Sequence, residues 1–188
     1  MTAITNIESK TDFRAPSTAK RLPRAVADAG AGVIIAVADI DGPPEAVFRA
    51  LTTDEIERWW AMPGVYRSTE WQADLRVCGA WSVVVVRSDG AAIRGFGEFA
   101  ELAFPHKIVM TRNFDNHPFL GPRETTITYC LEPIAAGTRL TVRDEGFIGR
   151  SEAAYGNAEI WEKVLGWLDA YVGATEMRLS HGARPGQS

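Results

Sequence analysis

The sequence predicts an α+β domain in which a curved antiparallel sheet of about six to seven strands wraps around one long C-terminal helix. Three observations lead to this fold class. The stretch 151–173 repeats apolar residues at helical spacing. Most of the chain between 68 and 145 is rich in β-branched residues or alternates apolar with polar ones, as antiparallel strands with one wet face do. Two short helical segments follow the first strand.

The first element is a strand at 33–40, a β-branched run that the turn Asp41-Gly42-Pro43-Pro44 ends. A short helix over 45–51 comes next, and a second helix begins at Thr53 and runs into Trp59 and Trp60. Turn residues then divide the chain into further strands, which are expected at 68–72, 80–87, 93–102, 107–113, 123–132 and 138–145.

The long helix is expected over 151–173, with Ser151 as its N-cap and Gly173 as a left-handed residue at its end. Gly166 lies on its polar side, where a close crossing by the N-terminal arm or by the second subunit of a homodimer would explain a glycine. The broad apolar face needs a sheet to pack on. A sheet curled around a helix leaves a cavity, which is the usual place for a small-molecule site.

The two ends of the chain are expected to lie outside the folded domain, which the periodic pattern places at 33–173. Residues 1–32 lack sustained periodicity and should form a flexible arm, with a short Ala-rich helix near Ala25; residues 174–188 should form a flexible tail. The alternative, a partner-binding or targeting arm, depends on a basic cluster of Lys20, Arg21 and Arg24.

Composition argues against several classes of function. The net charge of −4 gives no electrostatic case for nucleic-acid binding. No apolar run is long enough to span a membrane, and the N-terminus lacks the apolar core of a secretory signal, so we expect a cytoplasmic protein. Cys78 and Cys130 are far apart, and the three histidines have no short-spaced partners. We therefore expect solvated histidines, no metal site and no cofactor.

Three segments carry a resemblance to a known family: Phe48-Arg49-Ala50-Leu51-Thr52 with Ile56 and Trp59-Trp60; Asp74 to Trp81; and Thr138 to Val142 with Glu145-Gly146-Phe147 and 161–168. In their order and spacing they resemble the helix-grip superfamily of START lipid-transfer domains, polyketide cyclases and the birch-pollen allergen (SRPBCC), and within it the bacterial Aha1-like proteins. Cys78 stands where the family usually has the first of two glycines. The resemblance implies a helix-grip fold with a ligand cavity, but this superfamily has diverse ligands and few shared catalytic residues.

Eight apolar residues are candidates for the cavity wall. They are Trp59, Trp60, Trp81, Phe96, Phe114, Tyr129, Trp161 and Leu165. Ordinary core packing is the alternative role for any one of them. As a set they favour an apolar or aromatic ligand, because aromatic walls stack on flat molecules.

Four charged residues are weak candidates for catalysis. Arg94 and Glu98 share a face with Phe96 if their strand is regular, but a bulge at Gly95 and Gly97 would reverse that face and leave a solvent-exposed ion pair. The other two candidates are near strand ends, where surface salt bridges are the alternative: Arg112 and Glu145.

Three functions fit these observations. The leading hypothesis is the binding of a small hydrophobic or aromatic molecule in the cavity. The second is a polyketide cyclase or dehydratase-like enzyme, with Glu98 or Glu145 as acid or base and Arg94 or Arg112 steadying an enolate. The third is a protein-binding module, by analogy with the co-chaperones of the namesake family, which would need an exposed apolar patch.

Overall fold

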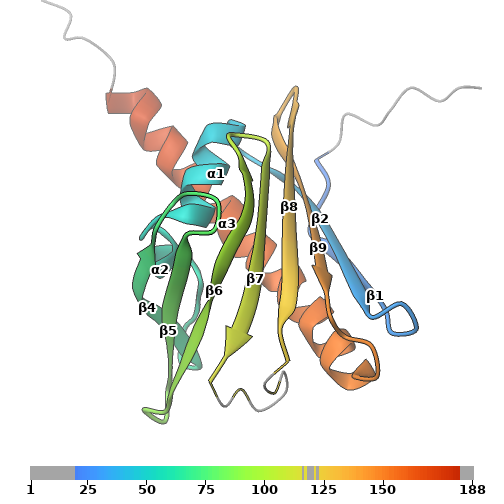
Figure 1. Ribbon diagram of the computed structural model, residues 1–188. Coiled ribbons are helices and arrows are strands. Elements are labelled where there is room, and N and C mark those ends of the chain that lie inside the picture. Colours follow the sequence, from blue (N-terminus) through green and yellow to red (C-terminus); the bar gives the residue numbers. More distant parts are fainter. Residues whose placement is uncertain (1–19, 116, 118–120, 122, 183–188) are drawn as a thin grey trace, which may run out of the picture.

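The computed structural model describes residues 20–115, 117, 121 and 123–182, and it shows one nine-stranded antiparallel sheet with three helices (Figure 1). The spatial order of the strands is β1-β2-β9-β8-β7-β6-β5-β4-β3. The strands are β1 (Arg24–Asp28), β2 (Val33–Ile40), β3 (Ala61–Met62), β4 (Tyr66–Ala73), β5 (Ala80–Arg87), β6 (Ala92–Ala103), β7 (Lys107–Phe114), β8 (Thr125–Ile134) and β9 (Gly137–Glu145). The helices are α1 (Pro44–Thr52), α2 (Ile56–Trp59) and α3 (Ser151–Gly182).

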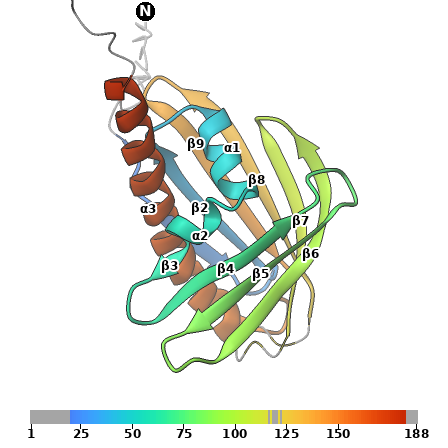
Figure 2. The same cartoon turned by 90° about the vertical axis from the view of Figure 1, so that its left-hand side faces the viewer.

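The sheet curls around α3, and α1 and α2 lie between the two on one side (Figure 2). Register shifts mark bulges in β4 between Thr69 and Gln72 and in β6 between Phe99 and Glu101. Bulges increase the bend and twist of a strand, so they help to close the sheet around the helix. The core lies between the concave face and α3, where Leu140, Val142, Leu165 and Leu168 are buried.

The count of nine strands exceeds the expected six to seven because β1 and β3 do not stand out in the sequence. Residues 24–28, where a short helix near Ala25 was predicted, form a strand that pairs with β2 along its whole length. The Ala25 backbone N–H also donates to Glu162 Oε1 of α3 at 3.0 Å. Strand pairing and contact with the helix therefore override the helical propensity of alanine.

The long helix ends at Gly182, not at Gly173 as predicted. Gly173 lies within the helix, and the turn after β2 packs closely on it: a Cβ at Gly173 would lie 3.3 Å from Asp41 Cβ. On the other side of this contact, a Cβ at Gly42 would lie only 2.4 Å from Val172 Cγ1. The two glycines let the turn and the helix approach each other. A Cβ at Gly166 would lie 3.9 Å from Pro23 Cγ, so the arm does cross there.

Residues 20–23, which we call the clasp, fasten the start of the described chain to the sheet and to α3. Lys20 Nζ lies 2.7 Å from Asp41 Oδ2 and 2.8 Å from both carboxylate oxygens of Asp169. The Arg21 N–H donates to Asp39 Oδ2 at 3.0 Å, and the Asp39 N–H donates to the Arg21 carbonyl at 3.1 Å. Of the flexible arm predicted over 1–32 and the flexible tail predicted over 174–188, residues 1–19 and 183–188 lie outside the described residues.

None of the helices in the described part of the chain combines the length and the apolar character that a membrane span requires.

Candidate functional site

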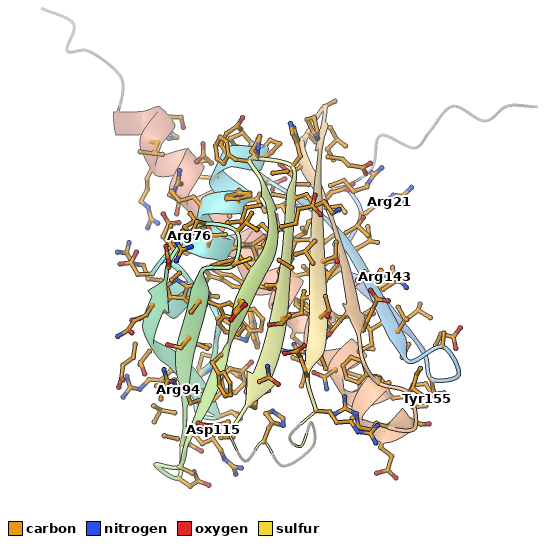
Figure 3. The ribbon with its side chains drawn as sticks, in the orientation of Figure 1. Arg21, Arg76, Arg94, Asp115, Arg143 and Tyr155 are labelled. Atoms are coloured by element: carbon orange, nitrogen blue, oxygen red, sulfur yellow. The ribbon has the colours of Figure 1, made fainter. Side chains whose placement is uncertain are left out.

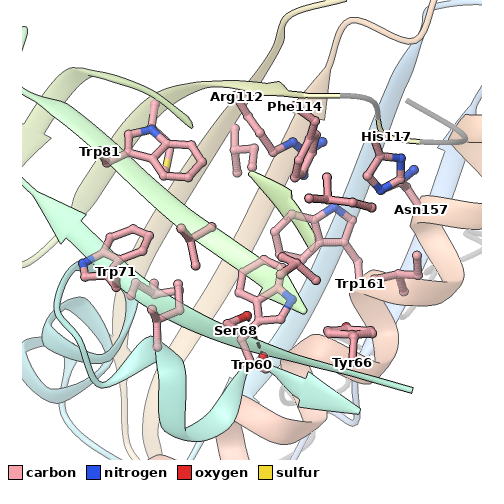
Figure 4. A pocket seen from close by; sticks show the side chains of 18 of the residues that line it. Trp60, Tyr66, Ser68, Trp71, Trp81, Arg112, Phe114, His117, Asn157 and Trp161 are labelled. Carbon is pink, nitrogen blue, oxygen red and sulfur yellow. Dashed lines mark hydrogen bonds between the residues drawn. The ribbon is translucent and has the colours of Figure 1, made fainter. Parts of the chain in front are cut away.

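A cavity of about 500 Å³ lies between the concave face of the sheet and α3 (Figure 4). Strands β4 to β8, helices α1, α2 and α3, and the segment around His117 all contribute to its wall. The wall is mostly aliphatic and aromatic, and several aromatic rings contact one another at its surface. Trp71 stacks on Trp81 with 5.6 Å between ring centroids, and Trp161 meets the edges of Trp60 at 5.8 Å and Tyr129 at 6.0 Å.

Of the eight residues predicted for a cavity wall, five line this cavity: Trp60, Trp81, Phe114, Tyr129 and Trp161. The other three lie elsewhere. Trp59 is buried against α1, where its indole N–H donates to the Ala50 carbonyl at 3.0 Å. Leu165 is core. Phe96 lies on the outer face of the sheet and is 37% exposed.

The strand parity of β6 settles the position of Arg94 and Glu98. Gly95 and Phe99 are buried, whereas Arg94, Phe96 and Glu98 are exposed on the face turned away from α3. Figure 3 shows Arg94 on this outer face. A Cβ at Gly95 would lie 3.0 Å from the Phe114 ring, so glycine lets this ring pack close to the inner face of β6.

Glu145 is also outside the cavity wall, in an ion pair with Arg143 at 2.7 Å. The burial pattern of β9 places Arg143 and Glu145 on its outer side. Neither of the carboxylates named in the enzyme hypothesis, Glu98 and Glu145, therefore faces the cavity. The cavity therefore does not bring together the acid and base named in that hypothesis.

The only predicted charged candidate on the cavity wall is Arg112, and its partner Asp144 was not predicted. Arg112 is 7% exposed and Asp144 is fully buried. Arg112 Nη2 donates to both carboxylate oxygens of Asp144 at 3.0 and 2.8 Å, and Nε donates to Thr125 Oγ1 at 3.0 Å. The Trp161 indole N–H also donates to Asp144 at 3.0 Å. Arg112 is therefore part of a buried network, not of a surface salt bridge.

The sequence does contain a signal for Asp144. Leu140 and Val142 alternate along the strand, and Asp144 continues the same inward-facing series, whereas Glu145 belongs to the opposite one. A buried carboxylate needs a partner. No spacing in the sequence identifies that partner as Arg112, because the two residues meet only across β8.

Burial changes the proton affinity of three groups around this network. It raises the pKa of the Asp144 carboxyl, against the opposing effects of Arg112 and of the Trp161 hydrogen bond. It also raises the pKa of the Tyr129 hydroxyl. Burial and the nearby charge of Arg112 lower the pKa of His117 to about 4. His117 is therefore a neutral residue of the cavity wall at neutral pH, not the solvated histidine predicted.

Within the described residues, no group of three or more His, Cys, Asp or Glu side chains is placed to hold a metal ion.

A model of the family described as Activator of Hsp90 ATPase homolog 1-like protein matches residues 41–173. Several solved structures have a similar fold. A Chromobacterium violaceum protein is 24% identical with a TM-score of 0.67, and the match covers 76% of this chain and 98% of that one. A Rhodobacter sphaeroides protein is 21% identical with a TM-score of 0.67, covering 80% and 99%. An Arthrobacter aurescens protein is 23% identical with a TM-score of 0.69, covering 80% and 91%. A search of curated proteins finds no significant match.

Proposed function

Because the chain belongs to the family of Activator of Hsp90 ATPase homolog 1-like proteins, whose fold accommodates ligands, we propose that it binds a small hydrophobic or aromatic molecule between the sheet and α3. The observation that carries this proposal is the cavity of about 500 Å³ with its apolar wall. Its volume lies within the range of about 300–1,000 Å³ that is typical of small-molecule sites.

The size of the cavity favours a binding site over a packing defect. Protein interiors are close-packed, and their voids rarely exceed the size of a water molecule. The surrounding core is tight: Phe99, Ile108, Leu140 and Leu168 are all fully buried. A wall that exposes several indole rings to an open space lacks the contacts that a ligand would supply.

The test places a large side chain in the cavity at one position of β5 and uses the same substitution at the preceding position as a matched control. Val85 lines the cavity, whereas Val84, the preceding residue of β5, is not part of its wall. The probe is N-phenyl-1-naphthylamine, a neutral aromatic molecule whose fluorescence rises in apolar surroundings. We expect it to bind the native protein and raise its melting temperature.

Val85→Trp should weaken binding of this probe at least about tenfold, because the larger indole occupies the space of the ligand. Val84→Trp introduces the same side chain outside the cavity and should leave the affinity within about threefold. Equal affinities of the two variants, or no binding to the native protein, would contradict the proposal.

A further inference from the structure

Most polar hydrogens on the cavity wall are already donated to protein acceptors. The groups concerned are the indole N–H of Trp71, Trp81 and Trp161, the Ser68 hydroxyl and the Asn157 amide. A ligand gains little by offering acceptors to these groups. The recognition chemistry therefore depends on the donors that remain.

Among the buried residues of the cavity wall, Arg112 and Tyr129 keep a donor that no described acceptor uses; the hydroxyl of the half-buried Tyr66, which bonds to Trp60, is a further donor of the wall. Arg112 uses Nε and Nη2 for Thr125 and Asp144, and its Nη1 donates to no atom of the described residues. The hydroxyl of Tyr129, a residue 3% exposed, likewise donates to no described acceptor. Neither atom is among the fully buried, unpartnered side-chain atoms of the described residues, and both residues line the cavity.

The Asp144 carboxylate beside Arg112 and the apolar wall favour a neutral acceptor over an anion. Asp144 already neutralises the Arg112 guanidinium, and a ligand carboxylate on Nη1 would share that one guanidinium with the Asp144 carboxylate. Two carboxylates on one cation repel each other, and the apolar wall makes the added charge costly to desolvate. His117 is neutral at neutral pH and adds no compensating charge. Arg150, whose positive charge also acts on Asp144 and Arg112, is not part of the cavity wall; it donates to the Gly146 carbonyl and lies over the Phe147 ring.

We propose that Arg112 Nη1 and the Tyr129 hydroxyl are the recognition donors of the cavity, and that they select an uncharged hydrophobic ligand carrying a carbonyl oxygen. A ketone, quinone, ester or lactone on an aromatic or alicyclic body fits this description. The inference builds on the proposed function and adds the polar group that the ligand must carry. A carbonyl oxygen is a strong acceptor without charge, so it satisfies a donor and leaves the Arg112–Asp144 pair intact.

Three naphthalenes of similar shape test this selection by displacement of N-phenyl-1-naphthylamine: 2-acetylnaphthalene, 2-isopropenylnaphthalene and 2-naphthoate. The ketone should bind about tenfold more tightly than the alkene, because a hydrogen bond to a charged donor contributes about that much. The ketone should also bind more tightly than the carboxylate at neutral pH. Equal binding of ketone and alkene, or tighter binding of the carboxylate, would overturn the inference and leave the cavity-binding proposal standing.

Variants of Arg112 and Tyr129 test whether these two donors cause the preference for the ketone. Tyr129→Phe removes only the hydroxyl and should reduce the ketone-to-alkene ratio about threefold. The double variant Arg112→Met/Asp144→Asn removes both charges together and should reduce the ratio toward one. The control Tyr155→Phe deletes the same hydroxyl from an exposed tyrosine of α3 outside the cavity and should preserve the native ratio. A native ratio in both donor variants would overturn the inference. Failure of the native protein to bind any of the four probes would overturn the cavity-binding proposal as well.

Discussion

The Arg112–Asp144 network makes a specific prediction about stability. Asp144→Asn keeps the shape of the side chain but removes its charge, so Arg112 is left buried without a counter-ion. The carboxylate accepts two hydrogen bonds from Arg112 and one from Trp161; in asparagine an amide nitrogen replaces one of the two acceptor oxygens and cannot accept the bonds which that oxygen accepted. Breaking a buried pair from one side costs about 3–5 kcal/mol. We expect a loss of this size in the free energy of unfolding.

A double-mutant cycle separates this pair from general disruption. Arg112→Met removes the ion-pair partner of Asp144 and should also cost about 3–5 kcal/mol. The double variant Arg112→Met/Asp144→Asn lacks both charges of the pair and should be clearly more stable than the sum of the two losses predicts. Urea unfolding at neutral pH, followed by tryptophan fluorescence, measures all four proteins.

Glu145, the residue that follows Asp144, supplies a matched control. Glu145 also carries a carboxylate and pairs with an arginine, but this ion pair is solvent-exposed. Glu145→Gln should therefore change the free energy of unfolding by less than about 1 kcal/mol. Losses that add within about 0.5 kcal/mol in the Arg112 and Asp144 cycle would refute the claim that the two charges compensate each other.

Three further predictions concern the backbone and the clasp. Cys78 has a positive φ of 59°, so Cys78→Gly should stabilise the protein by about 1 kcal/mol in urea unfolding; a destabilised variant would contradict this. Gly166→Ala should also stabilise by about 0.5–1 kcal/mol, since a Cβ there meets only ordinary contacts, whereas Gly97→Ala would place a Cβ 2.0 Å from the Thr111 carbonyl oxygen and should be the least stable variant by thermal melting. Burial alone would raise the pKa of Asp39, but hydrogen bonds from Arg139 and the Arg21 N–H lower it overall. Asp39 therefore contributes stability above its unfolded pKa, and this is lost as the pH falls through the lowered folded pKa, below about pH 4. Asp39→Asn should flatten the pH dependence of unfolding there, and an unchanged slope would contradict the assignment.

The sequence predicts a strand well where apolar and polar side chains alternate. It predicts a strand less well where backbone pairing with a neighbouring strand determines the conformation. The strands β2, β5, β7 and β9 coincide closely with their expected positions. Residues 24–28 were missed because an alanine-rich segment carries no strand signal of its own, and β2 determines its conformation. The resemblance to Aha1-like proteins is confirmed by the family match.

The residues of the cavity wall were predicted only in part, because their positions depend on the conformation of the strands. Large aromatic residues are visible in a sequence, but whether they face inward depends on strand parity. Glycines obscured that parity around Phe96, and Asp144 was missed although the parity of Leu140 and Val142 points to it. The pairing of Arg112 with Asp144 depends on sheet order, which no local pattern encodes. A protein-binding role for the chain stays a prediction.

The contacts of the clasp affect the choice of the N-terminal boundary for a fragment of this domain. A fragment limited to the family match, 41–173, would lack β1 and β2. Strand β9 would then become an open edge, and Arg139 would lose Asp39, its partner in the neighbouring strand. Such an edge invites pairing with other molecules. A fragment that keeps β1, β2 and the ion pairs of Lys20 with Asp41 and Asp169 therefore includes the chain from Lys20 onward.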